Sequence, residues 1–146
     1  MRIYIAAPLF SRAELDFNDT VASELRRNGF DVFLPQETGF PEEIPESEEG
    51  RRRILLEAFS KDIDGIRGCD ILLIVMDGRV PDEGACFELG YAYASGKICV
   101  GLKTDTRVSE LGLDNAMLTG SLGDNIARDI PSLIVMLKSI EVILTL

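Results

Sequence analysis

The sequence predicts an α/β domain with a mainly parallel sheet. Short apolar runs typical of strands alternate along the chain with segments of helical periodicity, which is the pattern of a parallel sheet covered by helices. The run 70–76 is the most apolar and is expected at the centre of the sheet, where both faces are buried. A length of 146 residues predicts one domain, 1–146, that is large enough to bury a core.

Five strands and four helices are expected. The strands cover 2–7, 30–34, 70–76, 98–102 and a short segment near 125–128. The helices cover about 11–28, 50–66, the segment around Glu88 and 131–143. Gly29 ends the first helix, and Pro131 lies in the first turn of the last.

Two loops are predicted. The loop 35–49 is rich in Pro and Glu and is long for a compact domain, so it is expected to be a lid or partly mobile. A second loop runs through Leu113 to the segment 114–117. No helix is predicted between this loop and the fifth strand.

Composition excludes several classes of function. The absence of histidine removes Ser-His-Asp and Cys-His catalysis and His-ligated zinc or haem. A net charge of −10 disfavours nucleic-acid polymers and anionic membranes, although a small nucleoside remains acceptable. Cys69, Cys86 and Cys99 lack a CxxC spacing and are expected to be buried, reduced thiols. With no leader or membrane-spanning run recognised, a soluble cytoplasmic protein is expected.

Glu88 is the only acid in a helical segment of small and aromatic residues, 84–96. Burying an unpaired charge is costly, so such an acid either has a structural partner or is held for chemistry. Asp82 lies six residues upstream, where the helix should start, so the two carboxyl groups can share one wall of a cleft. Two carboxylates in different surroundings are the usual equipment for cleaving a glycosidic bond.

The site is expected at the carboxyl ends of the strands, where open parallel sheets bind ligands. The segments expected there are 6–10, 35–36, 77–88 and the loop that reaches Asn115. The first segment lacks the glycine fingerprints of dinucleotide and triphosphate sites. Asp77 and Gly78 fit a simple turn.

Five segments resemble, in this order, motifs of the nucleoside 2-deoxyribosyltransferases. They are Tyr4-Ile-Ala-Ala-Pro-Leu-Phe10, Lys61-Asp-Ile-Asp-Gly-Ile66, Pro81-Asp-Glu-Gly84, Glu88-Leu-Gly-Tyr-Ala92 and Asn115-Ala-Met117. The likeness spans nearly the whole chain. It implies a flavodoxin-like three-layer fold with a mainly parallel five-stranded sheet, and transfer of 2-deoxyribose between the nucleobases of deoxynucleosides. This chemistry requires no metal or organic cofactor.

The resemblance also implies roles for the acids. Glu88 resembles the nucleophile that forms a covalent deoxyribosyl-enzyme, so that two inversions retain the anomeric configuration. Tyr4 resembles the phenol that orients this carboxylate. Asp82 and Asp62 resemble the acids that hold the base, and Asp82 is expected to protonate it as it leaves.

Four further residues are carried over in the same way. Phe10 resembles an aromatic wall against the base, and Gln36 matches a base-contacting residue loosely. Asn115 and Met117 resemble residues that a neighbouring subunit contributes near the sugar. The resemblance therefore implies a homo-oligomer with shared active sites.

The sequence leaves structural alternatives open for these assignments. Asp82 also fits a helix N-terminal acid favoured by the macrodipole, and Asp62 fits a solvated helix residue. Tyr4 and Phe10 also fit a hydrophobic core. Asn115 fits a turn or cap.

Two other functions are weighed. A 2'-deoxynucleoside 5'-monophosphate N-glycosidase would use related chemistry with water as acceptor, and the arginines 51–53 are available for its phosphate. Its usual Gly/Ser-rich first turn is absent, because 6–9 reads Ala-Ala-Pro-Leu. The terminal segment 142–146 lacks the aromatic end of some deoxyribosyltransferases. A non-enzymatic receiver-like module would need Asp77 phosphorylated beside an acid cluster near the first strand, where 4–7 offers none.

Overall fold

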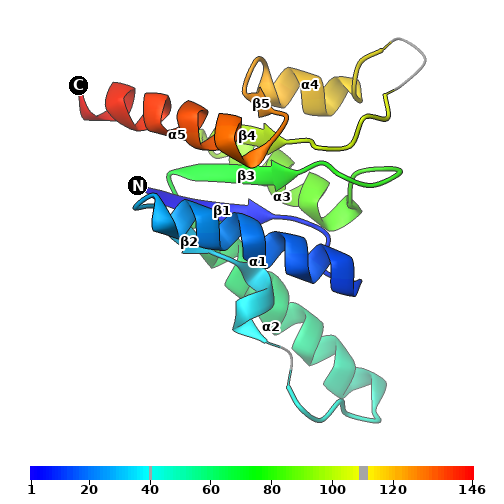
Figure 1. Cartoon of the computed structure of the whole chain (residues 1–146). Helices are drawn as coiled ribbons and strands as arrows, with labels where there is room; N and C mark the ends of the chain where they lie inside the picture. The colour runs from blue at the N-terminus through cyan, green and yellow to red at the C-terminus, as the bar shows by residue number, and fades with distance from the viewer. Residues whose placement is uncertain (40, 109–111) are drawn as a thin grey trace.

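Five apolar segments form one parallel sheet, shown in Figure 1. The structure is a computed structural model that describes residues 1–39, 41–108 and 112–146. The strands are β1 (Arg2–Ala6), β2 (Asp31–Phe33), β3 (Ile71–Val75), β4 (Ile98–Leu102) and β5 (Ile126–Ala127). Their order is β2-β1-β3-β4-β5, and every neighbouring pair is parallel. This is the flavodoxin-like order, so the predicted fold class is confirmed.

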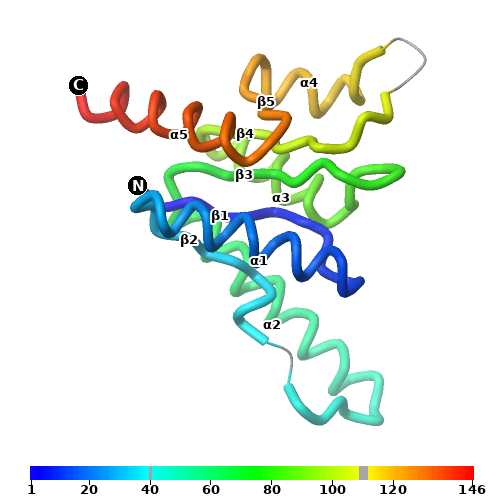
Figure 2. Tube along the Cα trace, viewed as in Figure 1, coloured from blue at the N-terminus to red at the C-terminus, as the bar shows by residue number. Residues whose placement is uncertain are grey.

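Helices cover both faces of this sheet. On one face lie α1 (Arg12–Arg27) and α5 (Ile130–Thr145). On the other lie α2 (Glu48–Arg67), α3 (Glu83–Ala94) and α4 (Ala116–Leu122). A short 3-10 helix, η1 (Pro35–Thr38), follows β2. The trace in Figure 2 shows that the amino-terminal end of α2 projects away from the sheet.

Strand side chains alternate between the two faces and divide the core into two halves. Ile3 and Ile5 of β1 pack with α1 and α5. Tyr4 and Ala6 point to the opposite face, which α2, α3 and α4 cover. All five residues of β3 are buried, and β3 is the middle strand. The expectation that the most apolar run is central is therefore confirmed.

Side-chain caps determine where the helices begin. Each α-helix in the described part of the chain is preceded by a residue whose side-chain oxygen accepts a hydrogen bond from a backbone N–H of the first turn. This bond satisfies a donor that the helix itself leaves free. These residues are Ser11, Ser47, Asp82, Asn115 and Asp129. Two of them, Asp82 and Asn115, are also candidate site residues.

The helix α4 is absent from the sequence-based prediction. It has only seven residues, among them Thr119, Gly120 and Ser121, which are weak helix formers. The Asn115 cap and the burial of Leu118 and Leu122 hold it in place. Tertiary packing therefore overrides local propensity here.

The loop after β2 is partly structured. In η1, Glu37 forms an ion pair with Arg26 of α1, with 2.7 Å between Nη1 and Oε1. Residue 40 of this loop lies outside the described residues. Whether the loop closes as a lid therefore stays a prediction. No helix in the described part of the chain is long and apolar enough to cross a membrane.

Candidate active site

The isolated acid of α3 has a partner on the sheet. Tyr4, in the middle of β1, is fully buried, and its hydroxyl donates a hydrogen bond of 2.7 Å to Oε1 of Glu88. The parallel pairing of β1 with β3 places Tyr4 next to Leu72, on the face that α3 covers. Two residues 84 positions apart in sequence are thus joined.

Burial shifts the proton affinity of both partners. It raises the pKa of the Glu88 carboxyl to about 7, opposed by the Tyr4 hydrogen bond and aided by the charges of Asp62 and Asp82. Burial and then the Glu88 charge raise the pKa of Tyr4 well above its usual range. Tyr4 therefore remains a hydrogen-bond donor, while Glu88 changes charge near neutral pH.

A second acid reaches this pair from α2. Asp62 lies beside the Tyr4 hydroxyl, and burial raises the pKa of its carboxyl against smaller lowering effects from Tyr4 and Lys61. The Tyr4 hydroxyl has one proton, which it donates to Glu88. Asp62 is thus a second carboxyl group beside the hydroxyl that orients Glu88.

Asp62 and Glu88 line one hollow between α2 and α3, of about 350 Å³. This volume lies within the range of small-molecule sites. The remaining lining residues are Phe59, Ile63, Ile66, Gly84 and Phe87. A mainly apolar hollow with two convergent carboxyl groups can hold a flat, uncharged ligand and perform acid–base or nucleophilic chemistry on it.

Asp82 serves first as a helix cap. Its Oδ2 accepts a hydrogen bond of 2.9 Å from the backbone N–H of Ala85. Asp82 is not among the residues that line the hollow, although its charge is close enough to raise the pKa of Glu88. One oxygen of Asp82 therefore has the structural role of a helix cap. The catalytic role of Asp82 stays a prediction.

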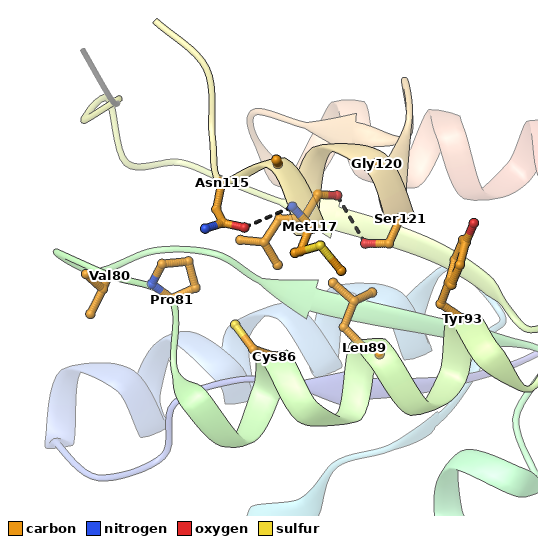
Figure 3. A pocket seen from close by; sticks show the side chains of 12 residues that line it. Val80, Pro81, Cys86, Leu89, Tyr93, Asn115, Met117, Gly120 and Ser121 are labelled. Atoms are coloured by element: carbon orange, nitrogen blue, oxygen red, sulfur yellow. Dashed lines mark hydrogen bonds between the residues drawn. The ribbon is translucent and has the colours of Figure 1, made fainter. Parts of the chain in front are cut away.

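A larger hollow of about 810 Å³ lies on the other side of α3, between α3 and α4 (Figure 3). Cys86 and Leu89 form part of its α3 wall, and Asn115 and Met117 belong to its α4 wall. Among the residues that the structure describes, no carboxylate lines it. The smaller hollow, where Asp62 and Glu88 converge, is therefore the candidate reaction site.

Asn115 and Met117 are thus separated from Glu88 within one chain. The Asn115 side chain caps α4 by accepting a hydrogen bond of 2.9 Å from the Met117 N–H. The Met117 side chain is 80% exposed. Their predicted role near a sugar in a neighbouring subunit stays a prediction.

Phe10 and Gln36 are also not among the residues that line the Glu88 hollow. Phe10 is largely exposed just before α1. The Gln36 amide is tied to α1, because its Oε1 accepts from Asn18 and its Nε2 donates to Asp19. Contact of either residue with a ligand stays a prediction.

Sequence reasoning missed the aromatic residues of this region. Phe59 and Phe87 line the hollow, with ring centroids 6.2 Å apart. Phe33 stacks on Tyr4 with ring centroids 5.2 Å apart. The spacing of Phe59 from Asp62, i to i+3 on one helix face, is a signal that could have found the first of them.

Asp77 connects two loops at this edge of the sheet. Its carboxylate accepts hydrogen bonds from the backbone N–H groups of Thr104 and Asp105, at 2.7 and 2.9 Å. Asp105 in turn accepts a hydrogen bond from the Gly78 N–H. Among the described residues, no group of three or more His, Cys, Asp or Glu is placed to hold a metal ion. Asp77 thus has structural partners of its own.

Comparisons identify similar proteins. The family model described as nucleoside 2-deoxyribosyltransferase matches residues 3–123. A solved 2-deoxyribosyltransferase from Bacillus psychrosaccharolyticus is 26% identical, with a TM-score of 0.73 over 92% of this chain and 90% of that chain. A conserved protein from Enterococcus faecalis V583 is 24% identical, with a TM-score of 0.77 over 95% and 98%. No curated protein sequence matches the chain.

A CMP N-glycosidase from Clostridium botulinum has the same fold. It is 17% identical, with a TM-score of 0.62 over 94% of this chain and 99% of that chain. At this identity the likeness shows the fold alone.

Proposed function

Because the chain belongs to the nucleoside 2-deoxyribosyltransferase family, we propose that it transfers 2-deoxyribose from one nucleobase to another, with Glu88 as a covalent nucleophile. The family and fold make it a nucleoside-modifying enzyme, either a transferase or an N-glycosidase. The observation that carries the proposal is the hydrogen bond from Tyr4 to Oε1 of Glu88. It orients the carboxylate and leaves Oε2 for bonding to the sugar.

The first step breaks the bond between the base and C1' of the sugar. Positive charge develops on the sugar as the bond lengthens, and the Glu88 carboxylate stabilises this charge and captures C1' as an ester. The base nitrogen leaves with the bonding electron pair and takes up a proton. A second base then attacks C1', its N–H proton passes to the acid that protonated the first base, and the Glu88 carboxylate leaves. Two inversions retain the configuration.

Glu88 must be ionised to act in this way. A pKa near 7 leaves about half of the molecules ionised at neutral pH. The same burial that raises the pKa also removes water from the carboxylate, which makes it more reactive toward the sugar.

The proton for the departing base is assigned to Asp62 rather than to Asp82, which the sequence favoured. Asp62 lines the hollow with Glu88, and burial raises the pKa of its carboxyl. Asp82 does not line the hollow, and its Oδ2 already accepts the Ala85 N–H. A carboxyl with a raised pKa keeps its proton to a higher pH, as a proton donor to the base requires.

An unphosphorylated nucleoside is the favoured substrate. Of the described residues, those that line the Glu88 hollow include two carboxyl groups and no lysine or arginine, so a 5'-phosphate would meet like charge. The arginines 51–53 belong to the first turns of α2. Arg51 lies eleven residues before Asp62, or about 16 Å along the helix axis.

A second subunit completes the site in this proposal. Asn115 and Met117 line the hollow on the far side of α3 from Glu88. If they contact the sugar, they do so in the site of a neighbouring copy. The proposal therefore includes a homo-oligomer with shared active sites.

Incubation of deoxyinosine with free adenine tests the proposal. We expect deoxyadenosine to appear by chromatography, with little free deoxyribose. Glu88→Ala is the control, because it removes the nucleophile. Free deoxyribose as the only sugar product would establish the hydrolase instead, and preferential cleavage of deoxynucleoside 5'-monophosphates would establish the nucleotide N-glycosidase.

A further inference from the structure

Phe33 connects Tyr4 to α2. Its ring stacks on the Tyr4 ring, with centroids 5.2 Å apart and planes 11° apart. The two residues are direct partners in the parallel pairing of β1 with β2. The guanidinium of Arg2 lies 6.0 Å from the centroid of the Phe33 ring. The ring is therefore held against Tyr4 and has little freedom to move away from it.

Gly65 of α2 faces the edge of this ring. A Cβ added at Gly65 would lie 2.9 Å from both Cε1 and Cζ of Phe33, which is too close for a carbon contact. Glycine inside a helix is unfavourable because of its backbone freedom. Glycine at this position therefore lets α2 lie closer to Phe33 than a residue with a Cβ could.

The position of α2 determines the position of Asp62. Asp62 and Gly65 are three residues apart on the same face of α2. A helix that approaches the sheet closely at Gly65 therefore also brings Asp62 close to the sheet. This is where Asp62 lies beside the Tyr4 hydroxyl and lines the hollow with Glu88.

We infer that Gly65 and Phe33 are positioning residues. They hold the side chains of Asp62 and Tyr4 close to that of Glu88. Phe33 stacks on the Tyr4 ring and holds it in place. Gly65 allows α2 to pack close to Phe33. The inference rests on the proposed function in so far as it concerns turnover. The relative positions of the Tyr4, Asp62 and Glu88 side chains do not depend on that function.

The test is a substitution with its own rescue. Gly65→Ala should lower kcat/KM at least tenfold, because the new methyl group pushes α2 or Phe33 away. Phe33→Leu removes the ring atoms that the methyl group meets. The double variant Gly65→Ala/Phe33→Leu should therefore recover at least threefold over Gly65→Ala alone.

The second readout is the titration of Glu88, followed by NMR of its labelled side-chain carboxyl. The groups that face Glu88 are Tyr4 from β1, Asp62 from α2 and Asp82 at the start of α3. In Gly65→Ala, Asp62 moves away and water enters, so the midpoint should fall by at least half a pH unit. The double variant should return it part of the way.

A core substitution on the opposite face provides the control. Phe30 lies in the half of the core that α1 and α5 cover, and Phe30→Leu is the control variant. It should lower stability without moving the Glu88 midpoint. If Gly65→Ala does not fold, Phe33→Leu alone still tests the inference, because loss of stacking on Tyr4 should move the midpoint while Phe30→Leu does not.

Two results would overturn the inference. One is a folded Gly65→Ala with wild-type turnover and an unchanged Glu88 midpoint. The other is a folded double variant that is no better than Gly65→Ala in either readout. If the wild-type protein neither transfers nor releases deoxyribose, the proposed function fails, but the titration still decides the positioning roles.

Discussion

Replacement of Glu88 by Gln should make the protein more stable at alkaline pH. The folded state raises the pKa of Glu88 from 4.5 to about 7, so it binds the proton more tightly than the unfolded chain does. Stability from this group is fully present below pH 4.5 and is lost as the pH rises toward 7. Gln keeps the neutral shape and does not titrate.

The size of the effect follows from the rise in the pKa of Glu88. A rise from 4.5 to about 7 corresponds to about 3 kcal/mol, and partial exposure of Glu88 reduces this to about 2–3 kcal/mol. For a chain of this length, 1 kcal/mol changes the melting temperature by roughly 2–4 °C. Glu88→Gln should therefore melt roughly 5–10 °C above the wild type at pH 8 and close to it at pH 4.

Urea unfolding at pH 4, 6 and 8 measures the difference directly. Glu83→Gln is the matched control, because Glu83 lies in the exposed first turn of the same helix. Loss of that charge should slightly destabilise the helix at pH 8, the opposite sign. If the free energy of unfolding varies with pH in the same way for the wild type and Glu88→Gln, ionisation of the buried Glu88 does not destabilise the folded state.

Three further outcomes test the division of roles. The kcat/KM should fall about tenfold per pH unit below pH 7, where Glu88 becomes protonated. Tyr4→Phe should raise the pH at which this fall begins by roughly half to one unit, because the hydrogen bond that lowers the pKa of Glu88 is lost. Asp62→Asn should slow the reaction of natural nucleosides more than that of nucleosides with activated bases. Equal losses of rate for both substrates, or a larger selective loss in Asp82→Asn, would identify Asp82 as the acid that protonates the base. Mixing inactive Glu88→Ala with inactive Asn115→Ala should restore part of the activity after subunit exchange, and no recovery would place Asn115 within its own subunit.

Periodicity predicts the sheet well because its signals are local. Each strand is an apolar run, and Gly29 with φ 89° ends the first helix region where expected. The central position of β3 follows from its uniform burial. The helix α4 could not be predicted in this way, because its stability comes from Leu118 and Leu122 packing on the sheet rather than from its own propensity.

The site was predictable only in part, and the limit is geometric. The isolation of Glu88 indicates that a partner exists, and the resemblance names Tyr4 for it, but sequence alone gives no distance between them. The placement of Asn115 and Met117 on the far side of α3 depends on how α4 packs. The tie between Gln36 and Asn18 depends on a buried amide network that no sequence pattern shows.

The three acids of this region differ in what surrounds them, and this difference can divide the chemistry among them. Asp82 is held by a backbone N–H at the start of α3, so one of its oxygens is committed to the fold. Glu88 is held by the neutral hydroxyl of Tyr4, which supports its charge without neutralising it. Asp62 lies beside that hydroxyl, and burial raises the pKa of its carboxyl. The two carboxyl groups of the hollow, Asp62 and Glu88, therefore stand in different surroundings, which is the arrangement that the proposed proton donor and the proposed nucleophile require.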